Sequence, residues 1–322
     1  TEDAAAGSVE QEEQEVQIGL SFESFVIERW MRERDVFVSA AKELGAEVNV
    51  QNANGDVEEQ ISQIEYFIKK QVDVIVVVAG DCEALSDVMI KAREAGIKTV
   101  SYDRLIMNAG CDLYISFDNT EVGRLMAESM LENIPDGGDI FLIQGPLTDN
   151  NVSLIREGID ETLAGSNLNV VYEANCPGWI AENAYTYTKE GLKLDRNVKG
   201  IICGNDDLAS QAFRALSEER LAGKVCVTGQ DGDLAACQRI VEETQEMTAF
   251  KSVEQEASLA AKCAVLLGLG EEIEEVQDTA YDGTYNVPYL ELQPIAVTKE
   301  NMDEVIIKGG FHAKEDVYLN VN

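Results

Sequence analysis

Polar and charged side chains follow several apolar runs of this sequence, at the points where buried strands would end. In KTVSYDRL, residues 98–105, the apolar run stops at Asp103 and Arg104, an acid beside a base. Because a buried charge is costly unless it is paired, such a step usually faces a cleft or a partner. The same order of apolar run, polar residues and helix recurs in GLSFESFVIERW, GNDDLAS, TGQDGDLAA and TAFKSVEQ. Ligands bind outside the carboxyl ends of strands in open parallel α/β sheets, so these groups predict a binding site.

The candidate site residues combine charged, amide and aromatic side chains. Three cations facing several carboxylates give a dense hydrogen-bonding site without large net charge, which suits a neutral ligand rich in hydroxyls. Aromatic rings suit the apolar C–H face of a sugar ring, although core packing is the alternative for both tryptophans. The candidate residues at the strand exits are Arg29, Asp103, Arg104, Asp149, Asn150, Asn151, Asn205, Asp206, Asp231 and Lys251, together with Trp30 and Trp179.

Several other chemistries lack the residues that they need. His312 is the only histidine, and with no nucleophile suggested nearby it is expected at the surface. No GxxxxGK[ST] loop occurs, and neither a cofactor nor a metal is expected. Residues 52–58 alternate somewhat as in a calcium loop but lack its length, so a turn followed by a helix cap at Asp56 is predicted. Asp149 and Asp231 could serve a glycosidase as paired carboxylates, which leaves an enzyme as an alternative hypothesis.

The net charge of −35, from 60 acidic and 25 basic residues, repels phosphate backbones and anionic membrane surfaces. Nucleic acid is therefore not expected as a partner. The sequence has no apolar run long enough for a membrane span and no signal peptide. Residues 1–15 are interpreted as a disordered acidic leader, or as the tether left after a secretion or lipoprotein signal has been removed.

The seven cysteines are dispersed and form no CxxC pair. Such a set is neither a disulfide framework nor a zinc site, and Cys203 and Cys226 are expected to be small core residues of strands. A disulfide between Cys82 and Cys111 stays open as an alternative.

The apolar periodicity predicts strands and helices in regular alternation. The run at 73–80 is so uniformly β-branched that both faces must be covered, as in a parallel sheet. Two blocks of βα units indicate two doubly wound α/β domains. The first block has strands at 16–21, 47–51, 73–80, 98–102 and 113–119, with helices including 30–44 and 84–95. The second has helices at 120–133, 152–164, 181–193, 207–219 and 233–243, strands at 139–145, 169–175, 200–206, 224–231 and 247–252, and then a helix at 254–269.

Short motifs in a fixed order cover residues 16–314. They resemble the sugar receptors of the periplasmic-binding-protein superfamily, specifically the D-xylose-binding receptors of ABC transporters. The motifs are ERWMRERDVF, VQNANGD, QISQIE, YDRLI, YISFDN, DNN, GW..ENA, NDDLA, GQDGDLA and VIIKGGFH. The departures lie at Cys176-Pro177 before the GW pair and at GTYNVPY in the third connecting segment, and they concern the shape of the pocket and the closure angle.

The resemblance implies a type I periplasmic binding protein with a three-segment hinge. The expected lobes are 16–118 with 254–290 and 119–253 with 291–322. A monosaccharide, D-xylose foremost and glucose or arabinose as alternatives, would be trapped between them by closure. The resemblance assigns ten of the twelve candidate residues to the sugar, all except Asn150 and Asp206. Arg104 is expected to point across the cleft. Pairing between Asp103 and Arg104 is the alternative.

The same resemblance implies an extracytoplasmic monomer, periplasmic or lipid-anchored, and not an enzyme. The expected partner is an ABC permease, with a membrane sensor kinase as the alternative. Transcription regulators share this fold, but they need a basic helix-turn-helix before the first strand, where this chain has acidic residues.

Overall fold

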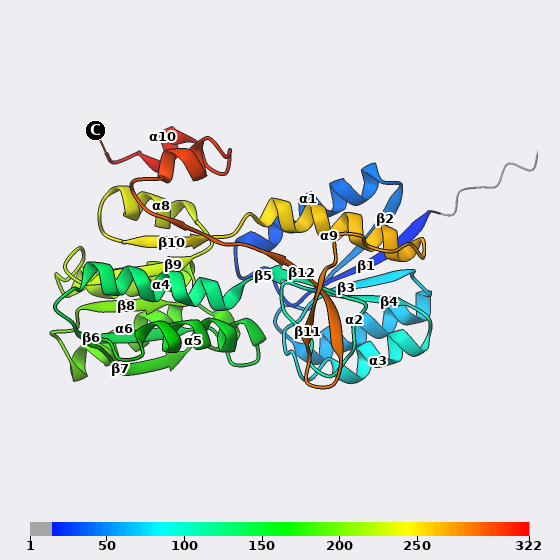
Figure 1. Ribbon diagram of the computed structural model, residues 1–322, viewed down its shortest axis with the longest axis horizontal. Coiled ribbons are helices and arrows are strands. Elements are labelled where there is room, and N and C mark those ends of the chain that lie inside the picture. Colours follow the sequence, from blue (N-terminus) through cyan, green and yellow to red (C-terminus); the bar gives the residue numbers. More distant parts are fainter. Residues whose placement is uncertain (1–14, 322) are drawn as a thin grey trace, which may run out of the picture.

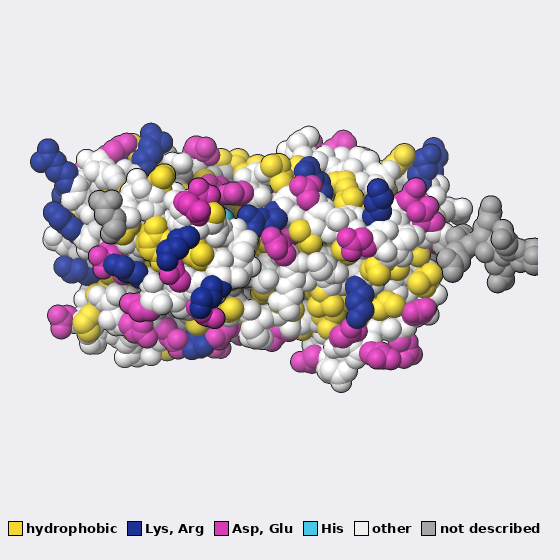
Figure 2. Space-filling view, turned by 90° about the horizontal axis from the view of Figure 1, so that it is seen from above, with side chains coloured by type: hydrophobic (Ala, Val, Ile, Leu, Met, Phe, Trp, Pro, Cys, Tyr) yellow, Lys and Arg dark blue, Asp and Glu magenta, His cyan; other side chains and the backbone are white. Residues whose placement is uncertain are grey.

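Two lobes lie side by side in the computed structural model, which describes residues 15–321 (Figure 1). Each lobe is built on one twisted sheet with helices on both faces. The acidic leader expected at 1–15 falls, except for Glu15, outside the described residues. Acidic and basic side chains are interspersed over both lobes on the face shown in Figure 2.

The first lobe contains a seven-stranded sheet in the order β11-β12-β5-β4-β3-β1-β2. All neighbouring strands are parallel except the β11–β12 hairpin. Its strands are β1 (Val16–Phe22), β2 (Ala46–Asn52), β3 (Val74–Val78), β4 (Lys98–Tyr102), β5 (Leu113–Phe117), β11 (Asp278–Tyr281) and β12 (Asn286–Leu292). Its helices are α1 (Arg29–Glu43), α2 (Val57–Lys70), α3 (Ser86–Glu94) and α9 (Val253–Gly268).

The second lobe contains a six-stranded sheet in the order β13-β10-β9-β8-β6-β7, with only β13 antiparallel to its neighbour. Its strands are β6 (Gly138–Gln144), β7 (Leu168–Asn175), β8 (Gly200–Cys203), β9 (Cys226–Gln230), β10 (Met247–Phe250) and β13 (Ile295–Val297). Its helices are α4 (Asn119–Asn133), α5 (Asn150–Leu163), α6 (Glu182–Leu194), α7 (Asp206–Glu218), α8 (Leu234–Val241) and α10 (Lys314–Val317), with a 3₁₀ turn at Pro177–Trp179 and a π-helical turn at Asp303–Ile307.

The sequence of β3 shows why the sheet is covered on both faces. Val74, Val76 and Val78 pack into one hydrophobic cluster of the first lobe. Ile75 and Val77 pack into another, on the opposite face of the strand. Because side chains alternate along a strand, a uniformly apolar run can be buried only when helices cover both faces. The doubly wound parallel architecture predicted from this run is confirmed.

The chain crosses between the lobes three times. The crossings follow Phe117, Phe250 and Leu292, each the last residue of a strand. The first and third crossings lie together, because the backbone N–H of Asp118 donates to the Leu292 carbonyl oxygen at 2.8 Å. Because β12 pairs with β5 as far as Leu292, the third crossing comes two residues later than the boundary expected at 290.

Both sheets place their central strands in the same order. Apart from the added strands at one edge, each follows the order 2-1-3-4-5, with β1 and β6 as the first strands. In such sheets a crevice forms where the strand order reverses, outside the carboxyl ends of the strands. The carboxyl ends of the two sheets therefore supply the loops between the lobes.

The ends of the helices are set by local polar groups. The helix expected at 84–95 begins at Ser86, because the Asp81 side chain accepts hydrogen bonds from the N–H groups of Glu83 and Ala84 and holds a turn there. Asp56 caps α2 by accepting from the N–H of Glu59, as predicted for the turn at 52–58.

All seven cysteines lie in the described part of the chain as free thiols. Cys82 and Cys111 are both buried and unbonded, so the alternative disulfide between them is not formed. Cys203 is buried in β8, as expected for a small core residue, whereas Cys226 in β9 is only partly buried.

Candidate functional site

All ten residues predicted for ligand binding lie around one cavity between the lobes, together with Ile27 and Gln230. Arg29 and Trp30 begin α1, and Asp103 and Arg104 follow β4. The second lobe contributes the residues that follow β6, β7, β8 and β9, and Lys251 comes from the second crossing. The carboxyl ends of the strands thus meet at one place, as the sequence predicted.

Arg29 is held by three buried carboxylates of the first lobe. Its Nε lies 2.6 Å from Glu33 Oε2, and its Nη2 lies 2.9 Å from both Asp103 Oδ2 and Glu256 Oε2. The Tyr102 hydroxyl donates to Glu33 Oε1 at 2.6 Å. The guanidinium also lies over the Trp30 ring, 4.1 Å from its centroid. These contacts fix both Arg29 and Trp30 at the wall of the cavity.

The carboxyl groups around Arg29 differ in how strongly they hold a proton. Although burial opposes ionisation, Arg29, Lys251 and Arg104 lower the pKa of Asp103 to about 2. Burial and the charge of Asp103 raise the pKa of Glu256 well above its usual range. Burial likewise raises the pKa of Glu33, against the attraction of Arg29. Asp103 is therefore the carboxylate of this group that stays ionised most readily.

Two side-chain contacts join the lobes across the cavity. Arg104 Nε lies 3.0 Å from Asp149 Oδ2, and Asn151 Nδ2 donates to Asp103 Oδ1 at 2.9 Å. Arg104 thus points across the cleft as expected. The alternative of pairing between Asp103 and Arg104 is wrong, because the closest cation to Asp103 is Arg29.

The lobes are closed on each other in this structure. The backbone N–H of Cys82 donates to the Thr148 carbonyl oxygen of the second lobe at 3.0 Å. The cavity has a volume of only about 20 Å³, enough for about one water molecule. The closed cleft therefore leaves little free space among its side chains.

Two of the cavity residues of the second lobe are N-caps of helices. Asp149 caps α5 by accepting from the N–H of Asn151, and its other oxygen accepts from Trp179 Nε1 at 3.0 Å. Asn205 caps α7 by accepting from the N–H of Leu208 at 2.9 Å. Each of these two side chains therefore caps the first turn of a helix and also faces the cavity.

The Trp179 ring lies directly against the backbone at Gly145. A Cβ added to Gly145 would lie 2.3 Å from the Trp179 ring, so only glycine fits beneath it. Trp30 and Trp179 are 1% and 4% exposed and pack in the core as well as lining the cavity. The core packing considered for both tryptophans is thus confirmed, while contact of their rings with a sugar stays a prediction.

Six polar atoms of the cavity residues are buried without a hydrogen-bond partner in the described chain. Leaving a buried donor or acceptor unpaired costs about 1–3 kcal/mol. Arg104 Nε belongs to this group, because its 3.0 Å ion pair with Asp149 lacks hydrogen-bond geometry. The donors are Trp30 Nε1, Arg104 Nε and Asn205 Nδ2, and the acceptors are Asn151 Oδ1, Gln230 Oε1 and Asp231 Oδ1. A hydroxyl both donates and accepts, so a molecule with several hydroxyls matches this mixture.

Gln230 and Ile27 were missed by the sequence reasoning. Gln230 ends β9, and its Nε2 donates to the Gly204 carbonyl oxygen at 2.6 Å. Its position at a strand end, directly before Asp231, could have identified it as a residue of the cavity. Ile27 is an apolar residue in a loop, and its sequence context carried no signal.

His312 is half-buried rather than at the surface. Its Nε2 lies 2.7 Å from the Gly232 carbonyl oxygen, and burial lowers its pKa. Within residues 15–321, no group of three or more His, Cys, Asp or Glu side chains is placed to hold a metal ion. None of the helices described is both long enough and apolar enough to span a membrane.

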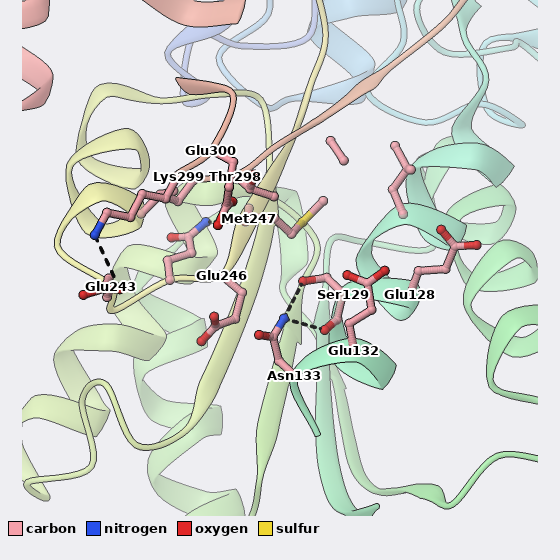
Figure 3. A pocket seen from close by; sticks show the side chains of 14 residues that line it. Glu128, Ser129, Glu132, Asn133, Glu243, Glu246, Met247, Thr298, Lys299 and Glu300 are labelled. Atoms are coloured by element: carbon pink, nitrogen blue, oxygen red, sulfur yellow. Dashed lines mark hydrogen bonds and ion pairs between the residues drawn. The ribbon is translucent and has the colours of Figure 1, made fainter. Parts of the chain in front are cut away.

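A larger cavity is an open groove on the second lobe, of about 630 Å³ (Figure 3). Glu132 of α4 faces it from one side, and Glu243, Lys299 and Glu300 face it from the other. These charged side chains are exposed, and the groove contains none of the candidate residues. Because exposed carboxylates are already solvated, they lack the unpaired buried atoms of the interlobe cavity.

Two hinged α/β lobes that close on a polar cavity define a class of ligand-binding receptor. A family profile described as "Periplasmic binding protein domain" matches residues 18–272, and the chain therefore belongs to this family.

Individual relatives cover nearly the whole chain. The chain is 44% identical to the D-xylose-binding periplasmic protein of Haemophilus influenzae, over 94% of this chain and 92% of that protein. It is 40% identical to the D-xylose-binding periplasmic protein of Escherichia coli, over 94% and 93%. A crystal structure of an ABC transporter solute binding protein from Clostridium phytofermentans with bound β-D-glucose is 26% identical, with a TM-score of 0.85, covering 94% of this chain and 99% of that one.

Proposed function

We propose that this chain is an extracytoplasmic receptor that binds D-xylose between its lobes and delivers it, as a monomer, to an ABC transporter permease. The observation that carries the proposal is the set of three unpaired donors and three unpaired acceptors in one interlobe cavity. The names of the two relatives at 44% and 40% identity support xylose as the sugar and the periplasm as the location.

The charges around the cavity favour a neutral ligand. Its lining contains the cations Arg29, Arg104 and Lys251 and the carboxylates Asp103, Asp149 and Asp231. The carboxylates already offset these cations, so a phosphate or a carboxylate ligand would meet as much repulsion as attraction. A sugar introduces no charge and offers a hydroxyl to each unpaired atom. We assign sugar contact to all ten predicted residues and to Gln230.

Closure follows from contact with both lobes. A ligand bound by Arg104 of the first lobe and by Asn205 and Asp231 of the second stabilises the closed form alone. It shifts the equilibrium by its difference in affinity for the two forms. With the third crossing after Leu292, the hinged units are 16–118 with 254–292 and 119–253 with 293–321. In this proposal the closed form is what the permease recognises.

Glucose is the second candidate ligand, because the structurally similar Clostridium phytofermentans protein holds β-D-glucose. An enzyme is not favoured, since Asp149 is already engaged by Trp179, Arg104 and the α5 N-terminus. A sensor kinase in place of the permease remains the alternative membrane partner.

A thermal-shift panel of pentoses and hexoses tests this function. A ligand at a hundred times its Kd stabilises the native state by about 2.7 kcal/mol. D-xylose at millimolar concentration should raise the melting temperature more than glucose or arabinose does. No shift with any sugar would refute the proposal, and a larger shift with glucose would correct the ligand.

A further inference from the structure

A second set of contacts joins the lobes outside the sugar cavity. Arg32 lies on α1 of the first lobe, and its Cζ is 4.0 Å from the centroid of the Phe311 ring. Its Nη1 also donates to the Phe311 carbonyl oxygen at 3.4 Å and lies 3.4 Å from Glu254 Oε1. Arg32 does not line the sugar cavity.

Phe311 belongs to the second lobe. It packs edge-on against Phe250 at 4.9 Å and against the cluster that contains Met302 and Ile306. The contact between Arg32 and Phe311 therefore links two units that the hinge moves apart.

The next residue ties this contact to the sugar site. The His312 ring packs on Phe311 at 4.6 Å, and its Nε2 lies 2.7 Å from the carbonyl oxygen of Gly232, which follows Asp231. A cavity of about 220 Å³ borders these residues and shares Arg29 and Asp231 with the sugar cavity. The positions of α1 and of the Asp231 loop are thus coupled through residues 311 and 312.

We propose that Arg32 and Phe311 form an interlobe latch that holds the closed form and slows sugar release without touching the sugar. This inference rests on the proposed function. An interaction that exists only in the closed form adds to apparent affinity through the opening equilibrium. A partly exposed cation–π contact of this kind should contribute about two- to fivefold. Changes of this type act mainly on dissociation rates.

Arg34 provides a matched control on the same helix. Its side chain is 34% exposed, as is that of Arg32. Its Cζ lies 5.2 Å from the ring centroid of Phe25, and its Nε lies 2.9 Å from Asp35 Oδ1, both within the first lobe. Arg34→Ala removes a comparable cation from α1 without removing a contact between the lobes.

The test measures the dissociation rate and Kd of D-xylose by stopped-flow tryptophan fluorescence and calorimetry. Arg32→Ala and Phe311→Leu should each raise the dissociation rate about two- to fivefold. The double variant should show little further increase, because both changes remove one contact. Arg34→Ala should match the wild type, and Arg32→Lys, which keeps the cation, should recover part of the loss.

The possible results separate this inference from the proposed function. If Arg32→Ala left the dissociation rate and Kd of D-xylose unchanged, the latch alone would be overturned. Fully additive effects of Arg32→Ala and Phe311→Leu would also overturn it. Absence of any sugar signal in the wild-type protein would overturn the proposed function and the latch together. The melting temperatures of the ligand-free variants show whether each one is folded.

Discussion

Asp231 combines burial with an unpaired oxygen. It is 5% exposed, its Oδ1 has no hydrogen-bond partner in the described chain, and Lys251 Nζ lies 3.6 Å away, beyond hydrogen-bond range. Such an atom costs free energy in the closed form until a ligand meets it. At the scale of single residues, the strongest sugar contacts are therefore expected at these unpaired atoms.

Asp231→Ala should weaken sugar binding by about 2 kcal/mol or more, because sugar hydroxyls and Lys251 then lose a carboxylate partner. Isothermal calorimetry with D-xylose measures the change. Asp136→Ala, at an exposed position of the same lobe, is the control and should bind as the wild type does. Equal affinities for the two variants would show that Asp231 does not contact the sugar.

Glu256 should make stability depend on pH. Burial and the Asp103 charge raise its pKa well above its usual range, against the attraction of Arg29. Above pH about 4.5 the unfolded chain releases this proton more readily than the folded one does. The Glu256 contribution to folding therefore declines as pH rises.

The comparison of Glu256→Gln with the wild type tests this dependence. The melting temperature of the variant relative to the wild type should increase from pH 5 to pH 8. Glu254→Gln, at an exposed position of the same helix, should show no such trend. A constant difference for Glu256→Gln across this range would contradict the assignment.

The residue set could be predicted because strand ends of a parallel sheet meet at one edge. The partners of these residues could not. The contact between Arg29 and Glu256 joins positions 227 residues apart in the sequence. Arg29 and Glu33 are four residues apart, which is also the spacing of ordinary ion pairs on a helix surface. Nothing in the sequence therefore distinguished this buried pair from an exposed one.

At the scale of elements, helix N-termini position part of the site. Asn205 divides its amide between two tasks, since Oδ1 caps α7 and Nδ2 is unpaired at the cavity. Removing the whole amide would confuse a loss of helix capping with a loss of ligand contact. A substitution that keeps one function separates them.

Asn205→Ser should keep the cap, because a serine hydroxyl also accepts from the first turn of a helix, but lose the amide donor. We expect affinity for D-xylose to fall about tenfold, with ligand-free stability within about 0.5 kcal/mol of the wild type. Asn205→Ala should lose both, with about 1 kcal/mol of stability. Calorimetry and urea unfolding measure the two quantities. Normal affinity of Asn205→Ser would exclude Nδ2 as a ligand contact.

Two glycines allow α4 and α5 to cross in close contact. A Cβ on Gly123 would lie 2.0 Å from the Ile155 carbonyl oxygen, and one on Gly158 would lie 2.0 Å from that of Thr120. Neither glycine could be assigned this role from the sequence. A glycine inside a helical pattern lowers the helix propensity but does not show which helix packs against it.

Gly123→Ala should destabilise the second lobe by about 1–3 kcal/mol, since backbone must move to admit the methyl group. Urea unfolding of the ligand-free protein measures the loss. Glu132→Ala, at an exposed position of α4, should change stability little. An unchanged midpoint for Gly123→Ala would mean that the helices separate without cost.

At the scale of the molecule, the alternation of strands and helices predicted both lobes, because each βα unit was marked by its own apolar periodicity. The packing of the last residues could not be predicted in this way. Phe311 and His312 follow no periodic element, and their contacts with Arg32 and Gly232 depend on how the lobes face each other. The surface position expected for His312 was wrong for the same reason.

The central claim is that a sugar enclosed by both lobes satisfies the unpaired atoms of the cavity. A crystal structure of the protein with D-xylose tests it most directly. The account predicts one sugar in the interlobe cavity, with its hydroxyls hydrogen-bonded to Arg104, Asn151, Asn205 and Asp231. A sugar bound elsewhere, or a cavity whose unpaired atoms make no contact with it, would contradict the account.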